Sequence, residues 1–193
     1  IGRFQPLHEE HVRLIQYALD TADQTLVLIG CSDEDGYSKK NPFTFEERAS
    51  LINDHFLGNS LIKLPLKDVK CDDSWVELVA QTIERIASQE ENEITFVCCN
   101  KDSSTTASNN LLKNLFPIKY LEATQNLNAT EIRNKFFNGD LKYITCIPHV
   151  TQQFLAQTEQ QLIQDCEVVV VLLTAGKTSI KTAIRSADHA TDL

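Results

Sequence analysis

Short apolar runs alternate with stretches of helical periodicity along most of the chain, and this alternation strongly constrains the fold. The predicted strands cover residues 25–30, 61–66, 94–98 and 118–122. The predicted helices cover residues 11–18, 45–56, 76–87 and 111–115, and another begins at Asn128. Strands that are apolar on both faces and alternate with helices predict a parallel sheet in a three-layer α/β fold.

Polar segments follow several of the predicted strands. They cover residues 2–11, 31–41, 100–104 and 126–133. Because ligands bind at the carboxyl ends of the strands in open α/β sheets, we expect these four segments to meet at one edge of the sheet.

The first of these segments, GRFQPLHEEH, has the composition of an anion site. If Pro6 to His8 lead into a helix, His8 and His11 lie on one face of its first turn. The amino end of a helix carries unpaired N–H groups and a partial positive charge. Two imidazoles and Arg3 beside it predict a site for phosphate groups.

Composition excludes several other classes of protein. The chain has 193 residues and a net charge of −9, whereas nucleic-acid and anionic-membrane binders carry basic surfaces. No apolar run is long enough to span a membrane, and we see no signal peptide. The six cysteines include no C-x-x-C pair, which favours reduced thiols and a cytoplasmic location.

The pattern of residues changes after Pro148. A glutamine-rich helix is predicted for residues 151–164, followed by an apolar segment at residues 168–173. We therefore predict a main domain over residues 1–147 and a small helical and strand appendage over residues 148–193.

Three motifs in the main domain occur in a fixed order. They are G-R-F-Q-P-x-H-x-x-H from Gly2, N-P-F-T-x-x-E-R from Asn41 and N-A-T-E-I-R from Asn128. Together they resemble the nicotinamide mononucleotide adenylyltransferases of the archaeal-type branch, which includes the adenylyltransferase domain of bifunctional adenylyltransferase/Nudix proteins. The resemblance implies a Rossmann-like nucleotidyltransferase fold for residues 1–147.

This resemblance also implies an activity and a site. ATP would transfer its adenylyl group to nicotinamide mononucleotide, giving NAD and pyrophosphate, with Mg²⁺ held by the ATP phosphates and not by the protein. The implied catalytic residues are His8, His11 and Arg133. The implied ATP-binding residues are Gly2, Arg3, Phe4, Gln5, Lys40, Arg48, Asn128 and Thr130, with Lys39 beside Lys40 in a loop that could close over the phosphates. The implied residues for nicotinamide mononucleotide are Asp72, Asp73 and Trp75.

Two positions depart from the pattern of the family. Glu10 stands where the family has the glycine of H-x-G-H, and we expect its carboxylate to point outward to solvent, away from the phosphates. Asn128 replaces a serine or threonine, a mild change because asparagine also caps helices.

Several alternatives stay open at this point. The acceptor could instead be nicotinic acid mononucleotide or phosphopantetheine, and Glu10 would also suit a nucleotide-binding regulator with weakened catalysis. We further expect a homo-oligomer that binds neither nucleic acid nor membranes.

Overall fold

The computed structural model describes residues 1–32, 38–86, 93–99, 110–124 and 127–159. The chain divides into two compact units, Ile1–Pro148 and His149–Leu193. In the second unit residues 149–159 are helical, and the rest of the predicted appendage lies outside the described residues. The functional division predicted after residue 147 stays a prediction.

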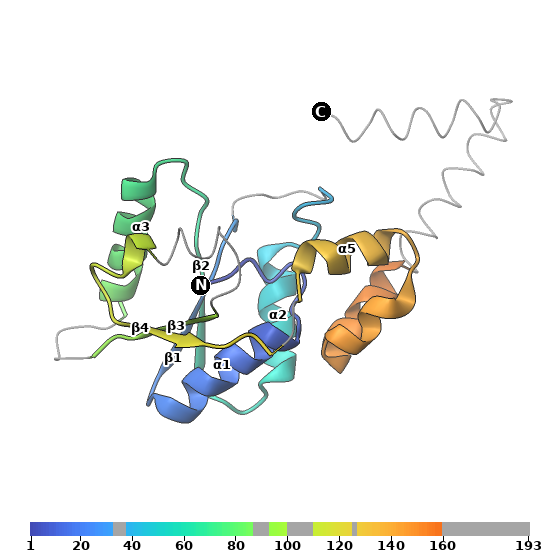
Figure 1. Ribbon diagram of the computed structural model, residues 1–193, viewed down its shortest axis with the longest axis horizontal. Helices are drawn as coiled ribbons and strands as arrows, with labels where there is room; N and C mark the ends of the chain where they lie inside the picture. The colour runs from blue at the N-terminus through green and yellow to red at the C-terminus, as the bar shows by residue number, and fades with distance from the viewer. Residues whose placement is uncertain (33–37, 87–92, 100–109, 125–126, 160–193) are drawn as a thin grey trace, which may run out of the picture. The chain divides into compact units, whose positions relative to one another are not determined.

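The first unit alternates helices with short strands (Figure 1). Its elements are α1 (Glu9–Thr21), β1 (Thr25–Ile29), α2 (Phe45–His55), β2 (Leu61–Pro65), α3 (Asp72–Glu84), β3 (Phe96–Cys99), β4 (Ile118–Leu121), α5 (Ala129–Phe137) and the 3₁₀ helix η1 (Leu141–Cys146). Residues 110–112 are also helical. Each predicted strand and helix of this unit is present, whereas η1 was not predicted.

The described strand pairs are parallel, as the sequence predicts. β1 pairs with β2, and β3 pairs with β4. A parallel bridge joins Gly2 to Ile29 on the other edge of β1, where the Gly2 amide donates to the Leu28 carbonyl at 3.0 Å. In the two registers, Thr25 lies opposite Leu61 and Phe96 lies opposite Ile118.

Helices cover β1 and β2 from both sides. One core cluster joins the strands to α3 and consists of Leu28, Leu66, Val79, Ile83 and Leu112. Because alternate residues of a strand face opposite ways, Val27 and Ile29 point away from this cluster. Both are buried, and α1 and α2 contact β1. Figure 1 shows α3 on one side of the strands and α1 and α2 on the other, which is the predicted layered arrangement.

A capping box fixes the start of α2. The Thr44 hydroxyl accepts a hydrogen bond from the Glu47 amide at 3.2 Å, and the Glu47 carboxylate accepts one from the Thr44 amide at 2.7 Å. Such reciprocal caps satisfy two N–H groups that a helix start leaves open. The cap thereby sets the position of the next residue, Arg48, at the carboxyl ends of the strands.

Arg48 joins the loops that follow these strands. Its guanidinium donates to the carbonyls of Arg3 and Gly30 at 2.7 Å each, to that of Cys31 at 3.1 Å and to that of Thr44 at 3.0 Å. Only 1% of the residue is exposed. Arg48 was expected to bind ATP phosphates; in the structure four of its hydrogen bonds are directed at backbone carbonyls, and a contact with phosphates stays a prediction.

We predict that Arg48→Lys destabilises the fold by about 2–4 kcal/mol, because an ammonium cannot reach the same four carbonyls and leaves buried acceptors without donors. Urea unfolding measures the change. Arg85→Lys, at an exposed position just after α3, is the matched control and should change the free energy of unfolding little. Equal stability of the Arg48 and Arg85 variants would contradict a joining role for Arg48.

Candidate active site

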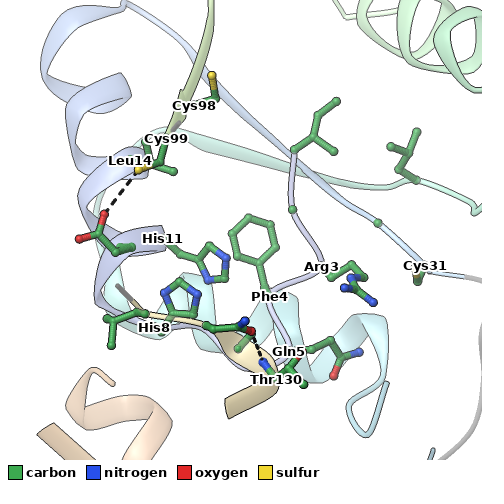
Figure 2. A pocket seen from close by; sticks show the side chains of 18 of the residues that line it. Arg3, Phe4, Gln5, His8, His11, Leu14, Cys31, Cys98, Cys99 and Thr130 are labelled. Atoms are coloured by element: carbon green, nitrogen blue, oxygen red, sulfur yellow. Dashed lines mark hydrogen bonds between the residues drawn. The ribbon is translucent and has the colours of Figure 1, made fainter. Parts of the chain in front are cut away.

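A cavity of about 550 Å³ opens beside the carboxyl ends of the strands (Figure 2). This volume suits a nucleotide-sized ligand. Most of the predicted site residues line it, namely Gly2, Arg3, Phe4, Gln5, His8, His11, Trp75, Asn128, Thr130 and Arg133. Four predicted residues do not: Lys40, Arg48, Asp72 and Asp73. The predicted segment at residues 100–104 lies outside the described residues.

The loop between Gly2 and α1 is held tightly at one wall of the cavity. Phe4 has a φ of 53°, and its ring lies so close to Gly2 that a β-carbon there would sit 3.0 Å from the ring. The Gln5 amide group donates to the Phe43 carbonyl at 2.8 Å and accepts from the Phe43 amide at 3.0 Å. The glycine and the glutamine of the first motif therefore shape the loop.

His8 and His11 present their rings to this cavity side by side. His8 is the N-cap of α1, and the two imidazoles stack with centroids 3.6 Å apart and planes 15° apart. The Phe4 ring lies 4.7 Å from His11, on a tilted plane (Figure 2). The predicted placement of both histidines at one helix start is confirmed, so ring nitrogens and the amino end of α1 face the same space.

Arg133 reaches the cavity from α5 and is fixed by backbone groups. It donates to the Gln5 carbonyl at 2.7 Å, to the Lys39 carbonyl at 3.0 Å and to the Thr130 hydroxyl at 3.1 Å. Burial, and to a lesser extent the positive charge of Arg3, lowers the pKa of Arg133. The two ion pairs found among the described residues involve neither arginine. A bound anion would therefore stabilise both charges.

The amino end of α5 adds backbone donors to the same wall. The Asn128 side chain accepts from the Thr130 amide at 2.8 Å, so asparagine caps the helix as predicted. Glu131 does not complete a capping box in the structure described here, because its carboxylate pairs with Lys135 at 2.7 Å.

The residues predicted to bind the acceptor do not all line the cavity. Trp75 lines the cavity and also packs on the core cluster that includes Val79. Asp72 and Asp73 are exposed in the first turn of α3, outside the cavity, where the helix dipole favours negative charge. The structure therefore does not bring these two residues together with Trp75 at the cavity, and their contact with the acceptor stays a prediction.

Asp68 is an acidic residue of the cavity lining that sequence reasoning missed. It lines the cavity, and the Cys31 thiol donates to its carboxylate at 3.6 Å. Asp68 follows β2 closely, so the strand-end rule that selected the other segments would also have found it.

Lys39 and Lys40 were expected to close over the phosphates from a loop. Lys39 and Lys40 are exposed, and neither lines the cavity. Lys39 instead offers its backbone carbonyl to Arg133. Since this carbonyl fixes the guanidinium, the loop positions an arginine in the structure.

Glu10 is not directed to solvent, which corrects the expected orientation. The residue is 3% exposed, and its carboxylate pairs with Arg13 at 2.9 Å. The other carboxylate oxygen accepts from the Thr124 amide at 3.1 Å and from the Thr124 hydroxyl. A charge that could repel phosphates is thereby balanced within the protein.

Neither a protein metal centre nor a membrane-spanning helix is found in the described part of the chain. No group of three or more His, Cys, Asp or Glu side chains there is placed to hold a metal ion. No helix among these residues is long and apolar enough to cross a membrane.

Comparison with known proteins places this geometry in a family. Residues 1–135 match the cytidylyltransferase-like family. The chain belongs to this family.

The relatives of this chain carry consistent names. The nicotinamide/nicotinic acid mononucleotide adenylyltransferase of Acinetobacter baylyi is 29% identical over 87% of this chain and 86% of its own length. The nicotinamide-nucleotide adenylyltransferase of the archaeon Pyrococcus furiosus is 26% identical over 72% of each chain. The resemblance inferred from the three motifs is confirmed.

Solved structures confirm the Rossmann-like fold. The bifunctional NMN adenylyltransferase/ADP ribose pyrophosphatase of Francisella tularensis superposes with a TM-score of 0.71 and 25% identity. The match covers 88% of this chain and 52% of that one, so this chain spans about half the length of the bifunctional protein. A second structure of that protein, complexed with AMP and a manganese ion, has the same fold at a TM-score of 0.70 and 24% identity.

We predict that pyrophosphate binds the free protein and that Arg3→Gln weakens this binding about tenfold, because one of two charged donors at the cavity is lost. Isothermal titration calorimetry measures the dissociation constant. Lys119→Gln removes the same charge from β4, outside the cavity, and should leave the constant unchanged. Equal weakening by both substitutions would indicate attraction by overall charge.

Proposed function

We propose that the chain transfers the adenylyl group of ATP to nicotinamide mononucleotide, giving NAD and pyrophosphate. The observation that carries this proposal is one cavity with His8, His11, Arg3 and Arg133 among its lining residues together with the indole of Trp75. The names of the Acinetobacter and Pyrococcus relatives support the same reaction.

The reaction requires positioning and charge stabilisation from the protein. An oxygen of the acceptor 5′-phosphate attacks the α-phosphorus of ATP in line, a new P–O bond forms, and the bond to the leaving pyrophosphate breaks with its electron pair. Arg3 and Arg133 hold the departing phosphates. His8 and His11 donate hydrogen bonds where negative charge grows in the transition state. No covalent intermediate on the protein is needed.

We propose Mg²⁺ as the helper ion, held by the ATP phosphates. The described residues offer no cluster of protein ligands, and oxygen atoms of phosphates are suitable ligands for this ion. When bound, Mg²⁺ neutralises part of the phosphate charge. The arginines and histidines of this chain would supply the remaining positive charge and orient the oxygens.

Trp75 is the residue that we propose for the nicotinamide ring. Its indole is half-buried, lines the cavity and is fixed against the core, so it offers a flat and rigid face for stacking. Nicotinic acid mononucleotide has a ring of the same shape, and the name of the Acinetobacter relative includes both acceptors. Phosphopantetheine lacks such a ring and would gain nothing from this indole.

A catalytically weakened regulator is the second candidate function. It was favoured only by the negative charge of Glu10, and this charge is paired with Arg13 in the protein. We therefore favour the enzyme. A cytoplasmic location and a homo-oligomeric state also belong to the proposal.

The direct test incubates the full chain with ATP, Mg²⁺ and each acceptor separately and identifies products by mass spectrometry. We expect NAD from nicotinamide mononucleotide and no product from phosphopantetheine. Nucleotide binding without any dinucleotide product would support the regulator.

We also predict that His11→Ala lowers kcat about 10²–10³-fold with little loss of stability, because one preorganised donor at the reacting phosphate is removed. Rates of NAD formation and thermal unfolding are measured together. His149→Ala, at an exposed position of the second unit, should leave kcat unchanged. An unchanged rate in the His11 variant would make His11 a packing residue.

A further inference from the structure

The buried carboxylate of Glu10 is the centre of a polar cluster that the proposed reaction does not require. One oxygen accepts from the Thr124 amide and hydroxyl. The other accepts from Arg13 Nη2 at 2.9 Å and Nε at 3.3 Å, and the Cys99 thiol approaches it at 3.9 Å. Burial of a carboxylate is unfavourable unless such partners compensate it, so the cluster points to a role for the carboxylate at this place.

The cluster connects three separate parts of the fold. Glu10 and Arg13 belong to α1, Cys99 ends β3, and Thr124 follows β4. Arg13 extends the connection, since its Nη2 also donates to the Glu122 carbonyl at 2.6 Å. We call Glu10, Arg13 and Thr124 the brace. It ties the first turn of α1 to the segment after β4.

The Glu10 end of the brace lies at the wall of the cavity that carries the histidines. Glu10 lies between His8 and His11 on the first turn of α1. The brace therefore links the helix turn that bears the imidazoles to the segment after β4.

We propose that Glu10 is a positioning residue that fixes the first turn of α1, and with it the histidine pair, against the segment that follows β4. The proposal rests on the proposed function, because it assigns the histidines to the phosphates of ATP. A buried carboxylate in the first turn of α1 fixes the helix start through its hydrogen bonds. Two competing roles for Glu10 are a contribution to stability alone and a general effect of negative charge near phosphates.

Replacement of the carboxylate distinguishes these three roles. In Glu10→Gln the side chain keeps its size, but the ion pair with Arg13 is lost and the first turn of α1 becomes less constrained. We expect kcat to fall about 10–100-fold, since small displacements of catalytic groups have effects of this size, and KM for nicotinamide mononucleotide to change less than about twofold. A role in stability alone would lower the unfolding temperature and leave kcat unchanged.

Glu9→Gln is the matched control for charge. Glu9 occupies the same first turn of α1 and carries the same charge, but it does not line the cavity. We expect its kcat within about twofold of the parent, whereas a charge effect predicts similar changes for both variants. Equal effects of the two substitutions would overturn the brace.

A double-mutant cycle tests the connection itself. Thr124→Val removes the hydroxyl that bonds Glu10, at an exposed position outside the cavity. We expect a severalfold lower kcat for this variant, and a double variant no slower than Glu10→Gln alone, because both changes break the same connection. Fully additive effects on kcat would contradict a shared role.

A readout without substrates separates failure of this inference from failure of the proposed function. Because the two imidazoles stack at 3.6 Å, their ring protons should show ring-current shifts in NMR spectra of the full chain. We expect these signals to move in Glu10→Gln and to stay in Glu9→Gln. Unmoved signals in the Glu10 variant would overturn the inference even if the parent makes NAD. If the signals move in Glu10→Gln but the parent protein makes no NAD, the positioning role of Glu10 stands and the proposed reaction is rejected.

Discussion

The bonds of Arg48 to backbone carbonyls are the constraint on which the cavity depends. Polar loops that end parallel strands would otherwise present carbonyls to each other at close range. One buried guanidinium gathers the carbonyls of Arg3, Gly30 and Cys31 and so holds two strand ends together. Because Arg3 and the residues after it form one wall of the cavity, the position of that wall follows from Arg48.

Positive charge is concentrated at this edge of an acidic protein. The chain carries a net charge of −9, yet Arg3 and Arg133 meet at the cavity beside two imidazoles. Each buried charge nearby has a structural partner: Arg133 is fixed by carbonyls, and Glu10 is neutralised by Arg13. The remaining donors face the space proposed for the phosphates of ATP.

Periodicity predicted the strands and helices well, because burial of one or both faces imposes a regular pattern on neighbouring residues. The strand-end rule then located most of the cavity. The partners of the buried charged side chains could not be predicted, since they depend on residues distant in sequence: Arg48 bonds Arg3, and Glu10 bonds Thr124. Sequence also did not reveal that Asp72 lies outside the lining of the cavity, because periodicity does not show which way the first turn of α3 faces.

We propose that this cavity holds ATP so that the acceptor phosphate attacks the α-phosphorus and neither of the other two phosphorus atoms. The most direct measurement follows label from ATP carrying ³²P at the α or the γ position during reaction with nicotinamide mononucleotide. We predict that the α label enters NAD and that the γ label leaves in pyrophosphate. Transfer of the γ label to the acceptor, or release of the γ label as orthophosphate without dinucleotide, would contradict it.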